Sequence, residues 1–190
     1  MSETSHIRTL NDMRRKAPLH FLNRARNARF SAWVIKDAQS RSLAEAIVTT
    51  SYDGSPSIAL HESFLREACV SLELILKAVI ARKIEKQVVR IDAVPATHDL
   101  TLLWDKAELP GLNNEDQLTL VIGSKILYWV GRYPAPKDDR YFDENIKKED
   151  ALRDYEKFGS MRLYRPRDVT WEQFDRLFQS ALSDFIAYYD

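Results

Sequence analysis

The chain contains a single cysteine, Cys69, and this scarcity excludes two classes of structure. One thiol cannot form an internal disulfide, and it cannot supply the paired cysteines of a typical zinc site. Cys69 falls inside an apolar stretch, so we expect a packed thiol and not a nucleophile. We predict no metal site and no cofactor.

Glycine and proline are also scarce, with 5 and 7 residues among 190. Few chain-breaking residues, beside many Ala, Leu, Glu, Lys and Arg, favour helices over sheet. No run approaches the roughly 18 apolar residues of a membrane-spanning helix, and the N-terminus lacks the apolar core of a signal peptide. We therefore expect a cytoplasmic protein with no membrane partner. Glycine-rich phosphate loops, HExxH and GxSxG are absent as well, which removes the enzyme classes that depend on them.

Basic and acidic side chains are equal in number, 28 of each, but they are unevenly placed. Residues 8–41 hold nine basic and two acidic side chains, whereas residues 138–156 hold eight acidic and four basic ones. Such asymmetry is typical of a nucleic-acid surface, of two segments that pack together, or of two subunits that meet. The candidates for nucleic-acid contact are Arg14, Arg15, Arg24, Arg26 and Arg29.

Residues 62–86, ESFLREACVSLELILKAVIARKIEK, predict a central helix. The stretch is long and lacks Gly and Pro, and it is apolar on nearly every side between residues 68 and 81. Glu73 and Lys77 interrupt this surface with the acid four residues before the base, a spacing that pairs well on a helix. They form either a structural ion pair at the edge of the core or the polar floor of a cleft between helices.

The other predicted helices are amphipathic. A first long helix runs from Pro18 to about Val48, with an alanine-rich face and a second face on which Phe30 and Trp33 alternate with Arg26 and Arg29. Those arginines form a solvated rim or a phosphate clamp. The remaining helices are a short one capped by Thr97, one opened by an Asn114–Gln117 capping box and ending near Gly131, and a last one opened by a Thr170–Gln173 capping box.

The fold that follows is all-α, an antiparallel bundle of four to five helices, because each helix must bury one stripe. We assign residues 1–17 to a loosely ordered segment and residues 18–190 to a single domain. Residues 87–97 receive no assignment. Within residues 133–168 we expect one helix in the acidic stretch and an extended MRLYRP segment.

Three short motifs resemble the HEPN domain superfamily. They are Glu73-Leu-Ile-Leu-Lys77-Ala78 in the central helix, His98-Asp99-Leu100 at the start of a short helix, and Trp129-Val-Gly131-Arg132-Tyr133-Pro134 after the fourth. The resemblance implies a prokaryotic helical bundle that dimerises. It further implies either a metal-independent ribonuclease of toxin–antitoxin, abortive-infection or CRISPR systems, or an inactive adaptor or partner of a minimal nucleotidyltransferase.

The ribonuclease motif of that group, an Arg followed four to six residues later by His in the late helical part, is missing. The histidines are His6, His20, His61 and His98, so no imidazole follows Arg132 to move a proton. Arg14 and Arg15 precede His20 at a matching spacing, but Pro18 lies between them.

The leading prediction is therefore a HEPN-like, non-catalytic binding or regulatory module, linked through the resemblance to bacterial defence or toxin–antitoxin systems. Its partner is a second copy, a partner protein, or an RNA or nucleotide. The alternatives are an RNA-binding protein that uses the basic first helix, or a divergent ribonuclease that uses His20 with Arg14 or Arg15, or His98 near Arg132. The candidate cleft consists of Glu73, Lys77, His98, Asp99, Arg132 and Tyr133.

Overall fold

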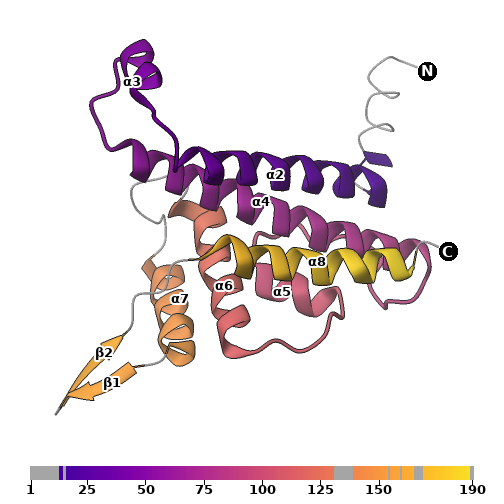
Figure 1. Ribbon diagram of the computed structural model, residues 1–190. Coiled ribbons are helices and arrows are strands. Elements are labelled where there is room, and N and C mark those ends of the chain that lie inside the picture. The colour runs from indigo at the N-terminus through magenta and orange to yellow at the C-terminus, as the bar shows by residue number, and fades with distance from the viewer. Residues whose placement is uncertain are drawn as a thin grey trace.

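The computed structural model describes residues 13–14, 16–130, 139–153, 155–158, 160–164 and 169–188. The predicted all-α helical bundle is confirmed, with one small β-hairpin added (Figure 1). The predicted loosely ordered segment 1–17 lies mostly outside the described residues. The elements are α2 (Pro18–Ala38), α3 (Ala44–Thr50), α4 (Pro56–Glu85), α5 (Leu100–Lys106), α6 (Asn114–Lys125), the π-helix η1 (Ile126–Val130), α7 (Asp139–Leu152), β1 (Tyr155–Phe158), β2 (Met161–Tyr164) and α8 (Trp171–Ala187).

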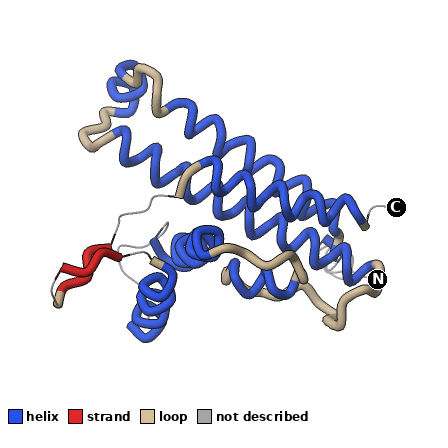
Figure 2. The backbone as a smooth tube through the Cα atoms, turned by 60° about the horizontal axis from the view of Figure 1, so that its bottom comes forward, coloured by secondary structure: helices blue, strands red, loops and turns tan. Residues whose placement is uncertain are grey.

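Helix α4 is the centre of the bundle, as predicted. It contacts α2, α5, α6, η1 and α8, and its buried residues run from Phe64 to Lys83. Leu72, Ile75 and Leu76 are at most 2% exposed, and each such side chain contributes roughly 1.5–3 kcal/mol by leaving water. Figure 2 shows α2, α4 and α8 as long neighbouring rods.

Small residues bring α2 close to α4. Ala25 and Ala32 of α2 are fully buried against the core, and Ser71 of α4 donates a buried hydrogen bond of 2.8 Å to the Ala25 carbonyl. A larger side chain at either alanine would push the two helices apart.

A buried lysine joins three parts of the chain. Lys83 of α4 is 3% exposed, and its Nζ donates to the Ala107 carbonyl at 2.6 Å, just after α5. The same Nζ lies 2.9 Å from Oδ2 of Asp184 on α8. The ammonium is therefore neutralised and hydrogen-bonded, which a buried charge requires.

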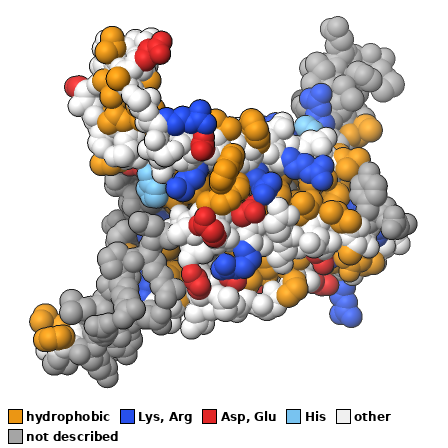
Figure 3. Space-filling model, viewed as in Figure 1, with side chains coloured by type: hydrophobic (Ala, Val, Ile, Leu, Met, Phe, Trp, Pro, Cys, Tyr) orange, Lys and Arg blue, Asp and Glu red, His pale blue; other side chains and the backbone are white. Residues whose placement is uncertain are grey.

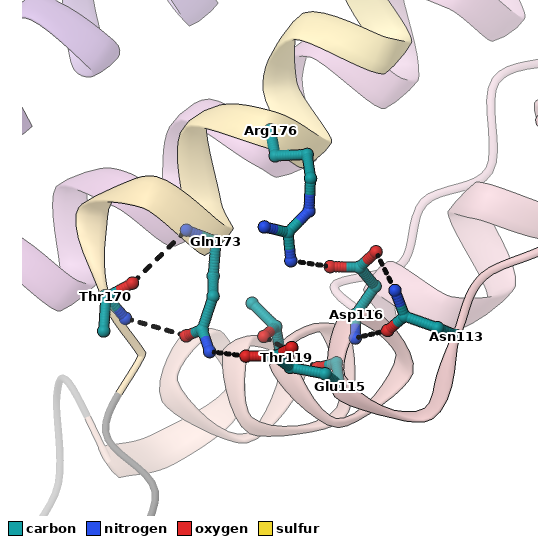
Figure 4. A network of polar contacts seen from close by, with 7 residues as sticks. All are labelled: Asn113, Glu115, Asp116, Thr119, Thr170, Gln173 and Arg176. Carbon is teal, nitrogen blue, oxygen red and sulfur yellow. Dashed lines mark hydrogen bonds and ion pairs between the residues drawn. The ribbon is translucent and has the colours of Figure 1, made fainter.

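Helix α8 begins with the predicted Thr170–Gln173 capping box, which is confirmed. A polar network then ties this end of α8 to the start of α6 (Figure 4). Gln173 contacts Glu115, and Arg176 donates to Asp116 at 2.6 Å, a bond that raises the pKa of Arg176. Phe174, Phe178 and Phe185 fill the core from the other side of the helix.

The first long helix was predicted to reach Val48, and this is wrong: α2 ends at Ala38. The N–H groups of Gln39 and Ser40 bond to carbonyls three residues back, and the Ser40 hydroxyl donates to the Asp37 carbonyl at 2.8 Å. A serine that bonds its own backbone in this way competes with the helical ladder. The short helix α3 follows and projects from the bundle with none of its residues buried (Figure 1).

Two predicted caps are displaced. Asp99, not Thr97, caps α5, because its carboxylate accepts from the Leu102 N–H at 3.0 Å. Likewise Asn113, not Asn114, caps α6 by accepting from the Asp116 N–H. In both cases the chosen residue is the one whose side chain lies beside the free N–H groups of the first turn.

Helix α7 and the β1–β2 hairpin form an arm on one side of the bundle (Figures 1 and 2). The predicted helix in the acidic stretch corresponds to α7, and the predicted extended segment to β2. The buried carboxylate of Glu149 holds α7 against α6 through Lys125 and also accepts from Arg153 at 2.9 Å. In the part of the chain that is described, no helix is both long and apolar enough to cross a membrane.

Candidate functional site

The structure brings three residues of the predicted cleft together. Glu73 and Lys77 lie one turn apart on α4, with 2.6 Å between Oε1 and Nζ. His98, in the loop before α5, places Nδ1 2.9 Å from the other carboxylate oxygen, Oε2. The Glu73 side chain is 11% exposed and that of His98 is 41% exposed, so the imidazole bridges the core edge and solvent.

Tyr128 and Thr97, which the sequence did not assign to the cleft, complete this cluster. The Tyr128 ring lies edge-on to His98 with 5.6 Å between ring centroids, and its hydroxyl is 3.2 Å from that of Thr97. Tyr128 belongs to the π-helix η1, whose wider turn directs the side chain toward His98. A π-helix has no recognisable sequence pattern, so this placement could not be predicted.

Asp99, which the sequence also placed in the cleft, has other partners than this cluster. Asp99 caps α5, and its Oδ2 lies 4.0 Å from Nζ of Lys148 on α7, so it serves the backbone and an exposed ion pair. Arg132 and Tyr133 lie outside the described residues.

The chemistry of the cluster is that of a held imidazole. A carboxylate that bonds one ring nitrogen fixes the orientation of the ring and leaves the second nitrogen to act. Both oxygens of Glu73 are already bonded, which is equally the arrangement of a satisfied structural group. Among the described residues no group of three or more His, Cys, Asp or Glu side chains could hold a metal ion.

The predicted packed thiol is confirmed. Cys69 is 2% exposed in the core, and burial raises the pKa of its thiol to about 12. A thiol held neutral in this way is a poor nucleophile, so Cys69 takes no part in a site.

A second candidate site lies where α2 and α8 run side by side, and we call it the α2–α8 seam. Its centre is Trp33 of α2 against Trp171 of α8, with 4.9 Å between ring centroids. Arg29 donates from Nε to Oδ1 of Asp175 at 2.7 Å, and its guanidinium lies over the Trp171 and Phe178 rings. The arginine is thus fixed in place by a carboxylate and two aromatic faces.

The seam carries two surface hollows that share Trp33 and Trp171 as a common wall. The first has a volume of about 370 Å³ and the second about 440 Å³. Phe30 is 68% exposed and Trp33 47% exposed, and hydrophobic side chains are interspersed with charged ones on the face that carries α2 and α8 (Figure 3). The first hollow is lined by Arg26, Arg29, Phe30, Trp33, Trp171 and Asp175; the second by Trp33, Lys36, Asp37, Gln39, Ser40, Trp171 and Glu172.

Only the α2 residues of the seam could be recognised from the sequence. The alternation of Phe30 and Trp33 with Arg26 and Arg29 is visible in the first helix, but Trp171 and Asp175 come from the far end of the chain. Only tertiary packing places them opposite each other, so sequence spacing gave no signal for the hollows.

Among the described residues, the predicted nucleic-acid candidates do not all share one exposed face of α2. Arg14, Arg24 and Arg26 are exposed, Arg29 is bonded to Asp175, and Arg15 lies outside the described residues. Arg24 and Arg26 are two residues apart on α2, so they point about 200° apart around its axis.

Comparison with known proteins adds no relative. No family model, no curated protein and no solved structure matches this chain. The resemblance to the HEPN superfamily therefore stays a prediction based on the three sequence motifs.

Proposed function

We propose that the chain is a HEPN-like, non-catalytic module that binds a protein partner through the α2–α8 seam. The observation that supports this most is the exposed aromatic pair Phe30 and Trp33 beside two hollows. Aromatic residues and arginine are enriched at protein interfaces, and tryptophan and arginine often supply most of the binding energy. The bacterial defence or toxin–antitoxin setting implied by the resemblance belongs to the same proposal.

The charges around the seam favour a protein partner over RNA. Arg26, Arg29 and Lys36 contribute three positive charges and Asp37, Glu172 and Asp175 three negative ones, so the net charge is zero. A surface that follows a phosphate backbone needs a cationic track, because neutralising phosphates supplies most of that affinity. A balanced surface with aromatic anchors suits a partner that carries both signs.

Photo-crosslinking tests this proposal and separates the partner classes. A photoreactive phenylalanine analogue replaces Phe30 in the full chain, and the same analogue at the exposed Arg24, on another side of α2, is the control. We expect adducts at position 30 that nuclease leaves unchanged and in which mass spectrometry identifies peptides of a second polypeptide. Adducts that nuclease shortens would instead support the RNA-binding alternative, and equal adducts at both positions would contradict a role for the seam.

One contact favours a second candidate function, a divergent metal-independent ribonuclease. The Glu73–His98 hydrogen bond is the kind that orients a general base. The test is cleavage of single-stranded RNA by the wild type, His98→Ala and His20→Ala, of which His20 is exposed on α2. A cleavage activity that disappears with either substitution would overturn the non-catalytic proposal. We expect no such activity.

A further inference from the structure

Both hollows of the α2–α8 seam contain hydrogen-bond donors that have no acceptor. Nε2 of Gln39, which lines the second hollow, is buried and has no hydrogen-bond partner among the described residues. In the same part of the chain, the indole N–H groups of Trp33 and Trp171 donate to no acceptor either. The buried Trp104, by contrast, donates to the Pro110 carbonyl at 2.9 Å. A buried donor without an acceptor is unfavourable, so this surface is complementary to a ligand that brings acceptors.

The spacing of the two hollows matches one turn of a polyproline II helix. On α2, the first hollow is lined between residues 26 and 33 and the second between residues 33 and 40. The middles of these ranges are therefore about 10 Å apart along the axis, at roughly 1.5 Å per residue. One turn of a polyproline II helix, three residues of about 3.1 Å each, is about 9 Å long. Two prolines three residues apart therefore reach both hollows, one on each side of the wall that Trp33 and Trp171 form.

The charges beside the second hollow balance one another. Asp37 is paired with Arg41, which lies one turn further along the chain. Lys36 and Glu172 carry opposite charges on neighbouring helices. The backbone N–H of Glu172, the Thr170 hydroxyl and Lys36 lower the pKa of the Glu172 carboxyl, so it stays ionised. This hollow therefore offers no net charge to a ligand.

The first hollow keeps one positive charge. Arg29 is bonded to Asp175 at 2.7 Å, whereas Arg26 is exposed and forms no ion pair within the described chain. One such cation is too few for a phosphate backbone, which requires a track of them. A ligand with a single acidic side chain beside its apolar part is complementary to it.

We propose that the α2–α8 seam binds a proline-rich segment of a partner protein in the polyproline II conformation, with an acidic residue beside the prolines. Such a segment has no internal hydrogen bonds, so its carbonyls are free to accept from the indole and amide donors of the seam. Proline also lacks the N–H that a donor-rich surface would leave unsatisfied, and proline-rich segments dock in aromatic-lined grooves. A partner α-helix would offer no free carbonyls along its length, because each accepts a bond within the helix. This inference rests on the proposed function and names the chemistry of the partner segment.

Fluorescence anisotropy of labelled synthetic peptides, titrated with the full chain, tests the inference. One peptide has prolines three residues apart followed by a glutamate, and a second has the glutamate first, so that both chain directions are sampled. In the control peptides, alanine replaces every proline, or lysine replaces the glutamate. We expect saturable binding of at least one glutamate peptide and at least roughly tenfold weaker binding of its alanine control, because alanine supplies neither the ring nor the preformed conformation.

Four variants show whether the seam is the binding site. Trp33→Phe keeps an aromatic face but removes the indole N–H, and Gln39→Leu removes the unpaired amide; we expect each to weaken binding about three- to tenfold. Arg26→Glu should weaken the glutamate peptide about tenfold and strengthen binding of the lysine peptide, because the complementary charge is reversed. Arg24→Glu, the same change on another side of α2, should bind like the wild type. Thermal unfolding verifies that every variant is folded.

Several results would overturn the inference. They are a wild-type chain that binds neither glutamate peptide, equal binding of the alanine control, or an Arg24→Glu variant weakened as much as Arg26→Glu. If the wild type binds neither peptide but its position-30 adduct contains a second polypeptide, the proline-rich partner is wrong and the proposed function stands. An adduct that nuclease shortens would overturn both.

Discussion

Nδ1 of His98 lies 2.9 Å from Oε2 of Glu73, and this contact fastens the loop that precedes α5 to the central helix. The second oxygen of the same carboxylate binds Lys77 at 2.6 Å, so one acid holds a neighbour on its own helix and a residue from another segment. Of the two interpretations that the sequence left open, the structure contains the ion pair between Glu73 and Lys77, and the polar floor of a cleft stays a prediction.

Removing the Glu73 carboxylate measures its contribution to the stability of the fold. Glu73→Ala leaves the Lys77 ammonium, 13% exposed, without its partner and frees His98. We expect the free energy of unfolding in urea to fall by about 2–3 kcal/mol, the usual cost of a largely buried polar group left unsatisfied. Glu62→Ala, at an exposed position of the same helix, is the control and should change it far less. Equal losses in the two variants would show that the pair is not structural.

The buried lysine gives a second prediction. Lys83→Ala leaves Asp184 without its counter-ion, and we expect a loss of about 3–5 kcal/mol in unfolding free energy. The double change Lys83→Met with Asp184→Leu removes both charges and should recover most of that loss, since an apolar pair of similar size is often as stable. A double variant no more stable than Lys83→Ala would contradict this account.

Two substitutions test whether Asp99 or Thr97 caps α5. Asp99→Ala removes the side chain that accepts from the Leu102 N–H and should cost about 1 kcal/mol. Thr97→Val removes a hydroxyl that the sequence had suggested as the cap but that instead accepts from the Asp99 N–H. We expect the smaller change in thermal unfolding from Thr97→Val. A larger loss of stability in Thr97→Val than in Asp99→Ala would instead support Thr97 as the cap of α5.

Burial of Cys69 makes stability depend on pH in the alkaline range. Its pKa is raised to about 12 in the folded chain, whereas a thiol in an unfolded chain ionises near 8.5. The stabilisation is therefore complete below about pH 8.5 and is lost as the pH rises toward about 12, at up to roughly 1.4 kcal/mol for each pH unit. Denaturant unfolding of the wild type and Cys69→Ala at several alkaline pH values should give a steeper decline for the wild type. Parallel declines, or rapid reaction of the folded protein with a thiol reagent, would contradict it.

The central part of the fold could be predicted because its signals are local. The α4 stretch is apolar on nearly every side, and the Thr170–Gln173 box has both members within one turn. The displaced caps show the limit of such signals, since neighbouring Thr and Asp, or Asn and Asn, are all competent caps and only the backbone geometry selects one. The end of α2 at Ala38 depended on a serine–backbone bond that propensity does not report.

In the candidate sites too, contacts within one helix could be predicted and contacts between distant segments could not. Glu73 and Lys77 are one turn apart, so their contact follows from helical spacing, and a motif grouped His98 with them. Tyr128 lies in the Glu73–His98 cluster because of the π-helix η1. Trp171 contacts Trp33 only because α8 packs beside α2. Contacts between segments far apart in the chain depend on the whole arrangement, which one sequence does not specify pair by pair.

The position of Lys83 also has a consequence for biosynthesis. A ribosome delivers α4 long before residue 184, so the counter-ion that Lys83 has among the described residues is made late. The contact between α4 and α8 that buries this ammonium can therefore form only near the end of translation, after α8 has emerged.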